Sequence, residues 1–459
     1  MMRMAYNECM SQIKKITFIM TAALFILLFD ITVVITILPV MVTAFHADTS
    51  QFKLVIAMYL LFIGIFLPLS YWLSQRFGDK KVFVGGLLCF MLGSVLCSLS
   101  FNLPLLLIGR VIQALGAANV IASGIQIMMR LHKYESLSKV SGRILFYGIF
   151  GAVLGPLVGG LIYIFLPWQM VFLINLPIGM LLLSGLSGLS NQSSNSKNFD
   201  GLGWLFMSIM VMAFMMLFAE EGYILENGLG YLIIGFVTLI GFLYQLRHHP
   251  NPIFDLSLFK NKYFLSSLVV SNLMRMVVGG FFFTSIMFLE IGMKLLPIET
   301  GIVLCFFSVG AFMARGLMVK YGFSFSHVWQ HVMCGCVLAF AFLVMSQLTL
   351  AMHLYEIGLC FMVQGFLIAF FLRQTNRNVF IKVKKKQVFQ AMKIYTISQF
   401  TIWSMGVMLS SVILAFIMSE LVVASTLTLP CFEYMYVFLS VILLMVCVFI
   451  YCIESKKHD

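Results

Sequence analysis

The stretch Gly151–Gly160 reads GAVLGPLVGG, and the interpretation of the whole chain starts from it. Gly151, Gly155 and Gly159 are spaced four residues apart, so in a helix they lie on one face and leave almost no side chain there. A face of small residues lets a second helix approach closely, which is a common way for helices to associate in lipid. Pro156 lacks a backbone donor and predicts a bend at this point. The stretch therefore predicts a bent transmembrane helix with one tightly packed face.

The composition indicates a polytopic helical membrane protein. Of the 459 residues, 61% are hydrophobic and only 10% are charged, whereas soluble domains carry about 25% charged residues. The mean hydropathy is +1.04. Apolar runs of about 20 residues, the length that crosses a bilayer as a helix, recur along the whole chain. A transmembrane barrel would show short alternating segments instead, and the sequence has none. We therefore expect an all-α polytopic membrane protein.

The apolar runs predict fourteen transmembrane helices arranged as six, two and six. We expect an N-terminal six-helix bundle at 1–190, a linker with two extra transmembrane helices at 191–262, and a C-terminal six-helix bundle at 263–459. The linker between the first two parts is short and polar, as its sequence NQSSNSKNFD shows. The predicted spans are 16–41, 54–74, 82–101, 105–129, 144–166, 170–190, 202–219, 228–247, 265–289, 299–319, 327–348, 354–374, 395–418 and 431–453.

The distribution of charge predicts the orientation of the chain. The net charge of +12 does not indicate a nucleic acid partner, because the basic residues lie between the spans, as the positive-inside rule describes. Lys53 and Lys294 fall in loops assigned to the outside, and Arg110 and Arg275 fall inside spans. All other Lys and Arg residues lie on the side assigned to the cytoplasm. We expect a multi-pass protein of the plasma (inner) membrane with both termini in the cytoplasm.

The sequence shows no pattern typical of a metal or cofactor site. The ten cysteines lie mostly inside apolar runs, and Cys334 and Cys336 are wrongly spaced for a redox or zinc pair. No Gly-rich phosphate loop and no zinc signature occur. We therefore expect no cofactor, no metal and no catalytic residue, and no coupling to ATP hydrolysis within this chain.

Asp30 is the most informative single residue, because it lies within the first predicted span in LFDITVVITILP. A charged residue at the bilayer centre costs roughly 2.5–3.5 kcal/mol on insertion scales, so such residues usually face a cavity or a partner and serve a function. Arg110, in the fourth span, is the natural counterion, and since arginine stays protonated its role is electrostatic. The alternatives are a permanent structural ion pair and a position of Asp30 near the membrane edge. Arg275, in the ninth span, has no obvious neighbour in the sequence and either lines a cavity or pairs with a carboxylate elsewhere.

These motifs resemble those of proton-coupled antiporters in the major facilitator superfamily. The run G-x3-GP-x2-GG at Gly151–Gly160 resembles the fifth-helix signature of those antiporters. The six-two-six arrangement is similar to that of the fourteen-helix drug:proton antiporter branch. The other residues that match motifs of this branch are Asp30, Thr32 and Pro39 in helix 1, Arg110, Gln113 and Gly116 in helix 4, and Trp168, Asn175, Pro177 and Gly179 in helix 6.

The resemblance implies the major facilitator fold and export of cargo in exchange for protons, by alternating access around a midplane site. It implies that Asp30 carries the proton and that Arg110 is its electrostatic partner. The residues Gly151, Gly155, Pro156, Gly159 and Gly160 are then the antiporter seam, and Thr32, Gln113 and Arg275 are candidates for the cavity. The helix 6 residues, Asn175 among them, are expected to be mainly structural.

The stretch LSYWLSQRFGDKKVF resembles the cytoplasmic loop motif between helices 2 and 3 of the same family. Arg76, Gly78 and Lys80 match that motif. Gln75 stands where the family has an aspartate, and Asp79 supplies a carboxylate four residues later. We therefore expect a gate loop made of Arg76, Gly78, Asp79 and Lys80 that is weakened or rearranged relative to the family.

The cargo is poorly specified by the sequence. The 33 Met and 46 Phe residues suit large apolar ligands, but they are also ordinary packing residues. Drugs or other lipophilic or amphipathic compounds, together with protons, are the expected cargo. Export of one endogenous siderophore or lipid-like metabolite, and a non-transporting membrane sensor or scaffold, are the alternatives. A membrane-embedded enzyme is disfavoured because the histidines are scattered. Engagement of a periplasmic adaptor and the oligomeric state stay open.

Overall fold

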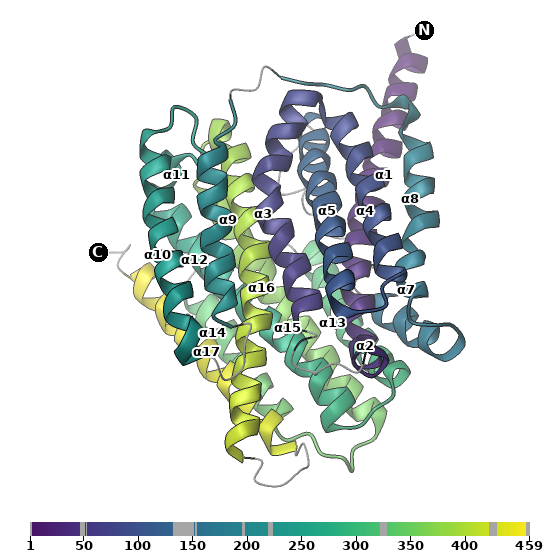
Figure 1. The fold of residues 1–459 in the computed structure, drawn as a ribbon, viewed down its shortest axis with the longest axis vertical. Coiled ribbons are helices and arrows are strands. Elements are labelled where there is room, and N and C mark those ends of the chain that lie inside the picture. Colours follow the sequence, from purple (N-terminus) through teal and green to yellow (C-terminus); the bar gives the residue numbers. More distant parts are fainter. Residues whose placement is uncertain are drawn as a thin grey trace. The chain divides into compact units, whose positions relative to one another are not determined.

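The computed structural model describes residues 2–45, 51, 53–131, 151, 154–194, 198–218, 224–321, 328–421 and 429–455, and these residues contain helices but no strand. Figure 1 shows the helices with their labels. In chain order they are α1 (Met2–Thr36), α2 (Leu38–Phe45), α3 (Lys53–Phe77), α4 (Asp79–Ser98), α5 (Leu103–Leu131), an unlabelled helix (Leu154–Phe165), α7 (Met170–Leu173), α8 (Asn175–Ser184), η2 (Gly185–Gly188), α9 (Gly201–Met216), α10 (Ile224–His248), α11 (Leu256–Phe259), α12 (Lys262–Met287), the π-helix η3 (Phe288–Gly292), α13 (Pro297–Tyr321), α14 (Val328–Met345), α15 (Leu354–Ile381), η4 (Lys385–Gln387), α16 (Val388–Leu421) and α17 (Leu429–Ser455).

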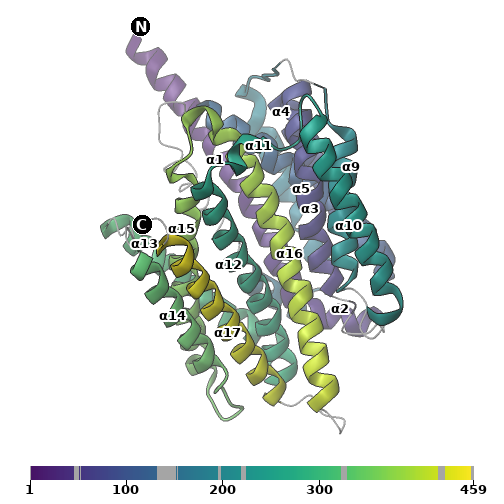
Figure 2. The same ribbon diagram turned by 90° about the vertical axis from the view of Figure 1, so that its left-hand side faces the viewer.

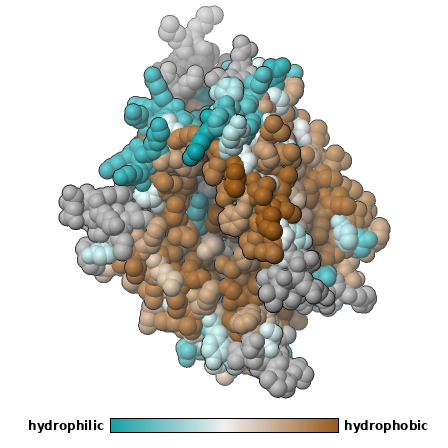
Figure 3. Space-filling view, turned by 60° about the vertical axis from the view of Figure 1, so that its left-hand side comes forward, coloured by the Kyte–Doolittle hydropathy of each residue, from teal (hydrophilic) through white to brown (hydrophobic). Residues whose placement is uncertain are grey.

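The helices confirm the predicted fold class. Within the described ranges, ten are long and apolar enough to cross a membrane, and four further apolar helices are 10–17 residues long. Each of these overlaps one of the predicted spans. The number of crossings stays a prediction, because four segments are short in the described part and residues 144–150 and 152–153 of the fifth span lie outside it. Figure 3 shows a broad hydrophobic surface, with hydrophilic side chains gathered mainly toward one end.

The chain divides into two compact units. Unit 1 comprises Met1–Ala47 and Phe62–Phe199, and unit 2 comprises Asp48–Leu61 and Asp200–Asp459. The predicted boundaries at residues 190 and 262, which separate two six-helix bundles from a pair of extra helices, stay a prediction.

Two breaks in the helices of unit 1 coincide with prolines. Pro39 cannot donate the helical hydrogen bond to the carbonyl four residues earlier, and α1 ends at Thr36 before α2 begins at Leu38. Pro177 has the same effect on the carbonyl of Leu173, the last residue of α7. Because the chain breaks there, Asn175 becomes the first residue of α8.

The C-terminal part of unit 2 differs from the prediction at one loop. By its charge, the segment Arg373–Lys393 is expected to be a long loop between two spans, but α15 continues to Ile381 and α16 begins at Val388. The apolar pattern marks only the part of a helix that lies in lipid, and residues such as Arg, Gln and Lys extend a helix beyond it at little cost. The connection is therefore short and contains only the turn η4.

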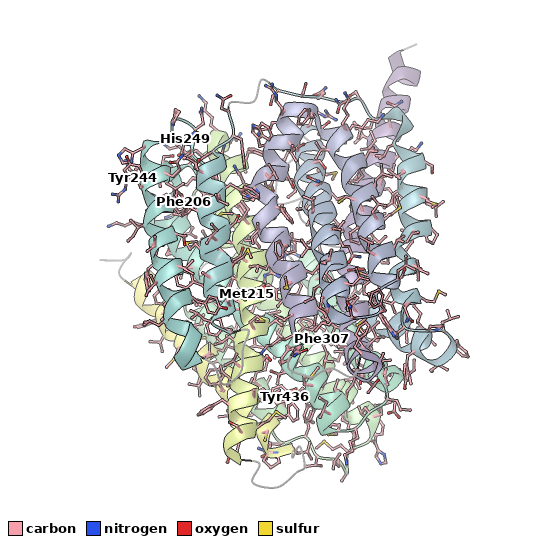
Figure 4. All side chains as sticks on the ribbon, viewed as in Figure 1. Phe206, Met215, Tyr244, His249, Phe307 and Tyr436 are labelled. Carbon is pink, nitrogen blue, oxygen red and sulfur yellow. The ribbon has the colours of Figure 1, made fainter. Side chains whose placement is uncertain are left out.

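In unit 2, α9 and α10 form a packed pair. Phe206 and Phe214 of α9 lie against Gly241 and Gly235 of α10, respectively. A core of Met207, Phe242 and Leu246 joins the same two helices. Figures 1 and 4 show α9 and α10 side by side, with Phe206 on the former and Tyr244 on the latter. The two helices thus share an apolar contact of their own.

Candidate functional site

Asp30 of α1 is the centre of a buried polar cluster in unit 1. Its Oδ2 accepts a hydrogen bond from Nη1 of Arg110 at 2.6 Å. Its Oδ1 accepts from Nε2 of Gln113 at 2.8 Å and from Nδ2 of Asn175 at 2.7 Å. Both carboxylate oxygens therefore accept and neither donates, which is the pattern of an ionised carboxylate.

The partners of Asp30 are also bonded to one another. Nη1 of Arg110 donates to Oε1 of Gln113 at 2.7 Å. The side-chain amides of Gln113 and Asn175 donate to Oγ of Ser94 at 2.9 and 3.2 Å. Asp30, Arg110, Gln113, Asn175 and Ser94 are all 0% exposed. We call these five residues the Asp30 cluster, and in this conformation it is sealed from solvent.

Glycines on α4 and α5 bring this cluster together. A Cβ atom at Gly93 would lie 2.5 Å from the backbone nitrogen of Gln113, and one at Gly116 would meet the backbone of Phe90. The two helices therefore touch backbone to backbone, which places Ser94 of α4 beside Gln113 of α5. Arg110 and Gln113 are three residues apart and share one face of α5.

The stability of the Asp30 cluster depends on the charges of Asp30 and Arg110. Removing one partner of a buried ion pair costs about 3–5 kcal/mol, because the other charge is left uncompensated in a low-dielectric environment. Protonation of Asp30 would leave Arg110 in that situation. Its guanidinium lies 5.9 Å from the ring centroid of Phe172, whose face compensates only part of such a charge. The buried pair is therefore stabilised by the presence of both of its charges.

The predicted seam packs against the same helix that carries Asp30. A Cβ atom at Gly151 would meet Phe25 of α1, and one at Gly155 would meet Phe29 and Thr32. A Cβ atom at Gly159 would meet Val33. Oγ1 of Thr32 lies 3.4 Å from the carbonyl oxygen of Gly151 and also bonds to carbonyls of α1 itself. Pro156 and Gly160 are buried. The seam is thus a close contact with α1.

The predicted gate loop is held in unit 1 by an ion pair and hydrogen bonds of Asp79. Its Oδ2 forms an ion pair with Nη1 of Arg130, at the end of α5, at 2.7 Å. Its Oδ1 accepts from the backbone nitrogens of Lys80 at 2.8 Å and Gln192 at 3.2 Å. Gly78 has a φ of 99°, a conformation that suits glycine, and lies against the side chain of Asn191. Asp79 thus holds together the ends of α3, α4 and α5 and the linker after α8, while Arg76 is exposed.

Arg275 of α12 lies in a second polar cluster, in unit 2. Its Nε donates to Oε1 of Gln399 on α16 at 2.5 Å, and its guanidinium lies 5.8 Å from the ring centroid of Trp403. Nε2 of Gln399 donates to Oδ1 of Asn272 at 3.0 Å and to Oγ of Ser271 at 3.3 Å. We call these five residues the Arg275 cluster. Arg275 is half-buried, and its partners here are neutral.

The sequence motifs identified only part of the Asp30 cluster. Asp30 and Arg110 meet as a pair, and Gln113 joins them. Asn175 was expected to be mainly structural, but it donates directly to Asp30. Ser94 was missed, because a serine in an apolar helix has no distinguishing pattern. Its position directly after Gly93, a glycine of the helix contact, is the one signal that could have found it.

Comparison with known proteins agrees with this architecture. Residues 20–399 match the family model of the Major Facilitator Superfamily. The chain is 28% identical over 320 residues to "Putative multidrug resistance protein MdtD" of Yersinia enterocolitica serotype O:8 / biotype 1B, covering 68% of this chain and 67% of that relative. It is 26% identical over 345 residues to the protein of the same name from Enterobacter sp. strain 638, covering 73% and 72%.

Solved structures show the same fold at low sequence identity. A POT family transporter in complex with 5-aminolevulinic acid superposes with a TM-score of 0.69 at 15% identity, covering 97% of this chain and 96% of that one. A POT family transporter with a thioalcohol-conjugated peptide gives a TM-score of 0.69 at 13% identity, with the same coverage. The helical membrane fold, the relatives and the match over residues 20–399 together show that this chain is a multi-pass membrane transporter belonging to the major facilitator superfamily.

Proposed function

We propose that this chain is a proton-coupled antiporter that exports drugs or other amphipathic compounds across the plasma (inner) membrane. The observation that carries the proposal is the fully buried pair of Asp30 and Arg110, joined at 2.6 Å within α1 and α5. Intramembrane carboxylates of this kind commonly serve proton relays in transporters. The multidrug names of the relatives support the choice of cargo.

The coupling follows from the charge balance of the Asp30 cluster. A proton that neutralises Asp30 removes the compensating charge of Arg110, and the conformation described here is then destabilised. Release of the proton restores the pair. Alternating access of the two predicted six-helix bundles follows from this cycle, with the glycine seam against α1 as the contact that adjusts. The basic residues between the spans support cytoplasmic termini.

The test is proton flux in proteoliposomes that contain the full-length protein. An inward-acidic gradient is imposed, a pH-sensitive dye reports it, and lipophilic cations, neutral drugs and organic anions are added in turn. We expect at least one cargo to dissipate the gradient with the wild type and not with Asp30→Asn. Asp255→Asn is the matched control, because asparagine can keep the hydrogen bond that Asp255 accepts from Ser257 at the start of α11.

The double variant Asp30→Asn/Arg110→Gln separates loss of coupling from loss of folding, because it removes both charges of the pair. Proton flux that persists in Asp30→Asn contradicts the proposal. A response to a single metabolite-like compound would instead favour an exporter of one endogenous substrate. A folded protein that moves no cargo and no protons would favour the sensor or scaffold.

A further inference from the structure

We infer that the Arg275 cluster binds the negatively charged group of the exported compound, a carboxylate or sulfonate on an apolar body. The inference rests on the proposed function only in taking the chain to be an exporter of small molecules. Arg275 lies near the middle of the candidate span Lys262–Gly292, where a charged side chain is expensive. A guanidinium kept at that depth needs a compensating partner.

The partners that the structure gives Arg275 do not compensate its charge. Within the described residues it forms no ion pair with Asp or Glu, and it contacts the side chain of Gln399 and the Trp403 ring. Arg110, by contrast, is paired with a carboxylate at 2.6 Å. A guanidinium presents a planar fork of donors that matches a carboxylate or a similar anion, which makes an anion the natural missing partner.

The neutral network holds Arg275 in a defined position. Gln399 donates through its amide nitrogen to Asn272 and Ser271, so its carbonyl oxygen is the atom directed at Arg275. Oγ of Ser271 in turn donates to Oδ1 of Asn376 on α15 at 2.8 Å. The charge is therefore oriented by groups that cannot neutralise it. Such preorganisation lowers the cost of binding an anion.

Close helix packing makes this position rigid. A Cβ atom at Gly279 of α12 would lie 2.6 Å from the carbonyl oxygen of Trp403, and one at Gly406 of α16 would meet the carbonyl oxygen of Met276. Figure 2 shows α12 and α16 running side by side in unit 2. The indole of Trp403 is fixed by this contact, yet Trp403, Tyr395 and Arg275 all remain partly exposed. The charge is accessible and does not belong to the closed core.

The neighbouring helix α15 carries a second buried polar side chain. Gln364 of α15 is 1% exposed, and neither atom of its side-chain amide has a hydrogen-bond partner among the described residues. Its position lies in the stretch of α15 that packs on α12, between the Phe281–Phe361 ring contact and the Ser271–Asn376 hydrogen bond. Figure 4 labels Phe307 and Tyr436, which pack on Phe281 at one end of this stretch. A buried amide without a hydrogen-bond partner among the described residues calls for an explanation.

The test measures binding to the purified full-length protein by calorimetry, with three compounds on one scaffold. These are naphthalene-2-sulfonate, the neutral naphthalene-2-sulfonamide and a naphthylmethyl-trimethylammonium cation. We expect the wild type to bind the sulfonate at least about tenfold more tightly than the sulfonamide, the value of one charge-assisted hydrogen bond. Arg275→Gln should remove this preference, with the largest loss of affinity for the sulfonate and no loss for the cation.

Gln399→Glu is the second variant, because it keeps Arg275 and supplies an internal carboxylate to the same Nε. It should abolish the preference for the sulfonate as completely as Arg275→Gln. Ser398→Ala, which removes a hydroxyl that donates to Asn272 without contacting Arg275, is the control and should bind like the wild type. Equal binding of the three compounds to the wild type, or a sulfonate preference that survives Gln399→Glu, would overturn the inference.

The two proposals fail in different ways. If the sulfonate binds through Arg275 but no compound moves protons, antiport is wrong and the anion site stands. If a cation exchanges for protons through Asp30 while the sulfonate is not preferred, antiport stands and the anion site is wrong.

Discussion

The Asp30 cluster of unit 1 and the Arg275 cluster of unit 2 lie beside the same kind of helix contact but differ in how their charge is compensated. In each, a charged residue lies within a long helix directly beside a contact in which glycine brings another helix close: Asp30 beside Phe29 and the seam, Arg275 beside Met276 and Gly406. The charge of Asp30 is compensated and fully buried, whereas Arg275 has neutral partners and is half-buried. The difference leads to two separate proposals, a response of the balanced pair to a proton and a response of the unbalanced charge to a ligand.

The largest effect is expected from breaking the balance in unit 1. Asp30→Asn should lower the free energy of unfolding by about 3–5 kcal/mol, because Arg110 is left buried without a counter-charge. Denaturant unfolding in detergent measures this. Asp30→Asn/Arg110→Gln should recover most of the loss. If the single variant is as stable as the wild type, Arg110 has another compensating partner and the comparison fails.

The next effect concerns the two glycine contacts, one beside each cluster. Gly155→Val places a branched side chain against Thr32 and the carbonyl of Phe29, and Gly406→Val does the same against Met276. Each should cost about 1–3 kcal/mol or more in stability through overpacking. Gly85→Ala is the control, because a Cβ atom there meets nothing within 4 Å, and it should be neutral or slightly stabilising. Thermal unfolding of the three variants compares them, and tolerance of both valines would show that the seams are loose.

A moderate effect is expected from Asn175. Asn175→Ala removes one hydrogen bond to the carboxylate of Asp30 and should cost about 1.5–3 kcal/mol. The Asp30–Arg110 pair itself stays intact, so proton-linked flux should be reduced but not lost. Measuring stability and flux on the same preparation distinguishes this from Asp30→Asn. Unchanged values for both would return Asn175 to a packing role.

The smallest effect is expected in unit 2. Gln364→Leu replaces an amide that has no hydrogen-bond partner among the described residues, so stability should change by less than about 1 kcal/mol or rise. Binding of naphthalene-2-sulfonate should nevertheless weaken if the amide meets the cargo. A loss of several kcal/mol in stability instead would mean that the amide is satisfied by the protein.

The sequence was sufficient for the fold and for one pair of the site. Apolar runs predicted the helices, and the resemblance paired Asp30 with Arg110. The sequence could not identify the partners contributed by other helices. Which residues of two packed helices lie opposite each other depends on their packing, and no local sequence pattern records it. Ser94 is one such partner, and Gln399, which is 124 positions from Arg275, is another. The seam was recognised from its glycines, but the helix it touches, α1, was not.

One turn of α1 makes two kinds of contact in unit 1, because Asp30 directs its carboxylate to α5 and α8 while Phe29, Thr32 and Val33 meet the glycines. A displacement of this helix caused at one flank is necessarily felt at the other. This has a genetic corollary. An Asp30→Glu strain is expected to grow poorly on a toxic cargo. Second-site mutations that restore its growth should map to the glycine face and to the α1 residues that contact it, because a slightly shifted α1 can accommodate the longer side chain of glutamate.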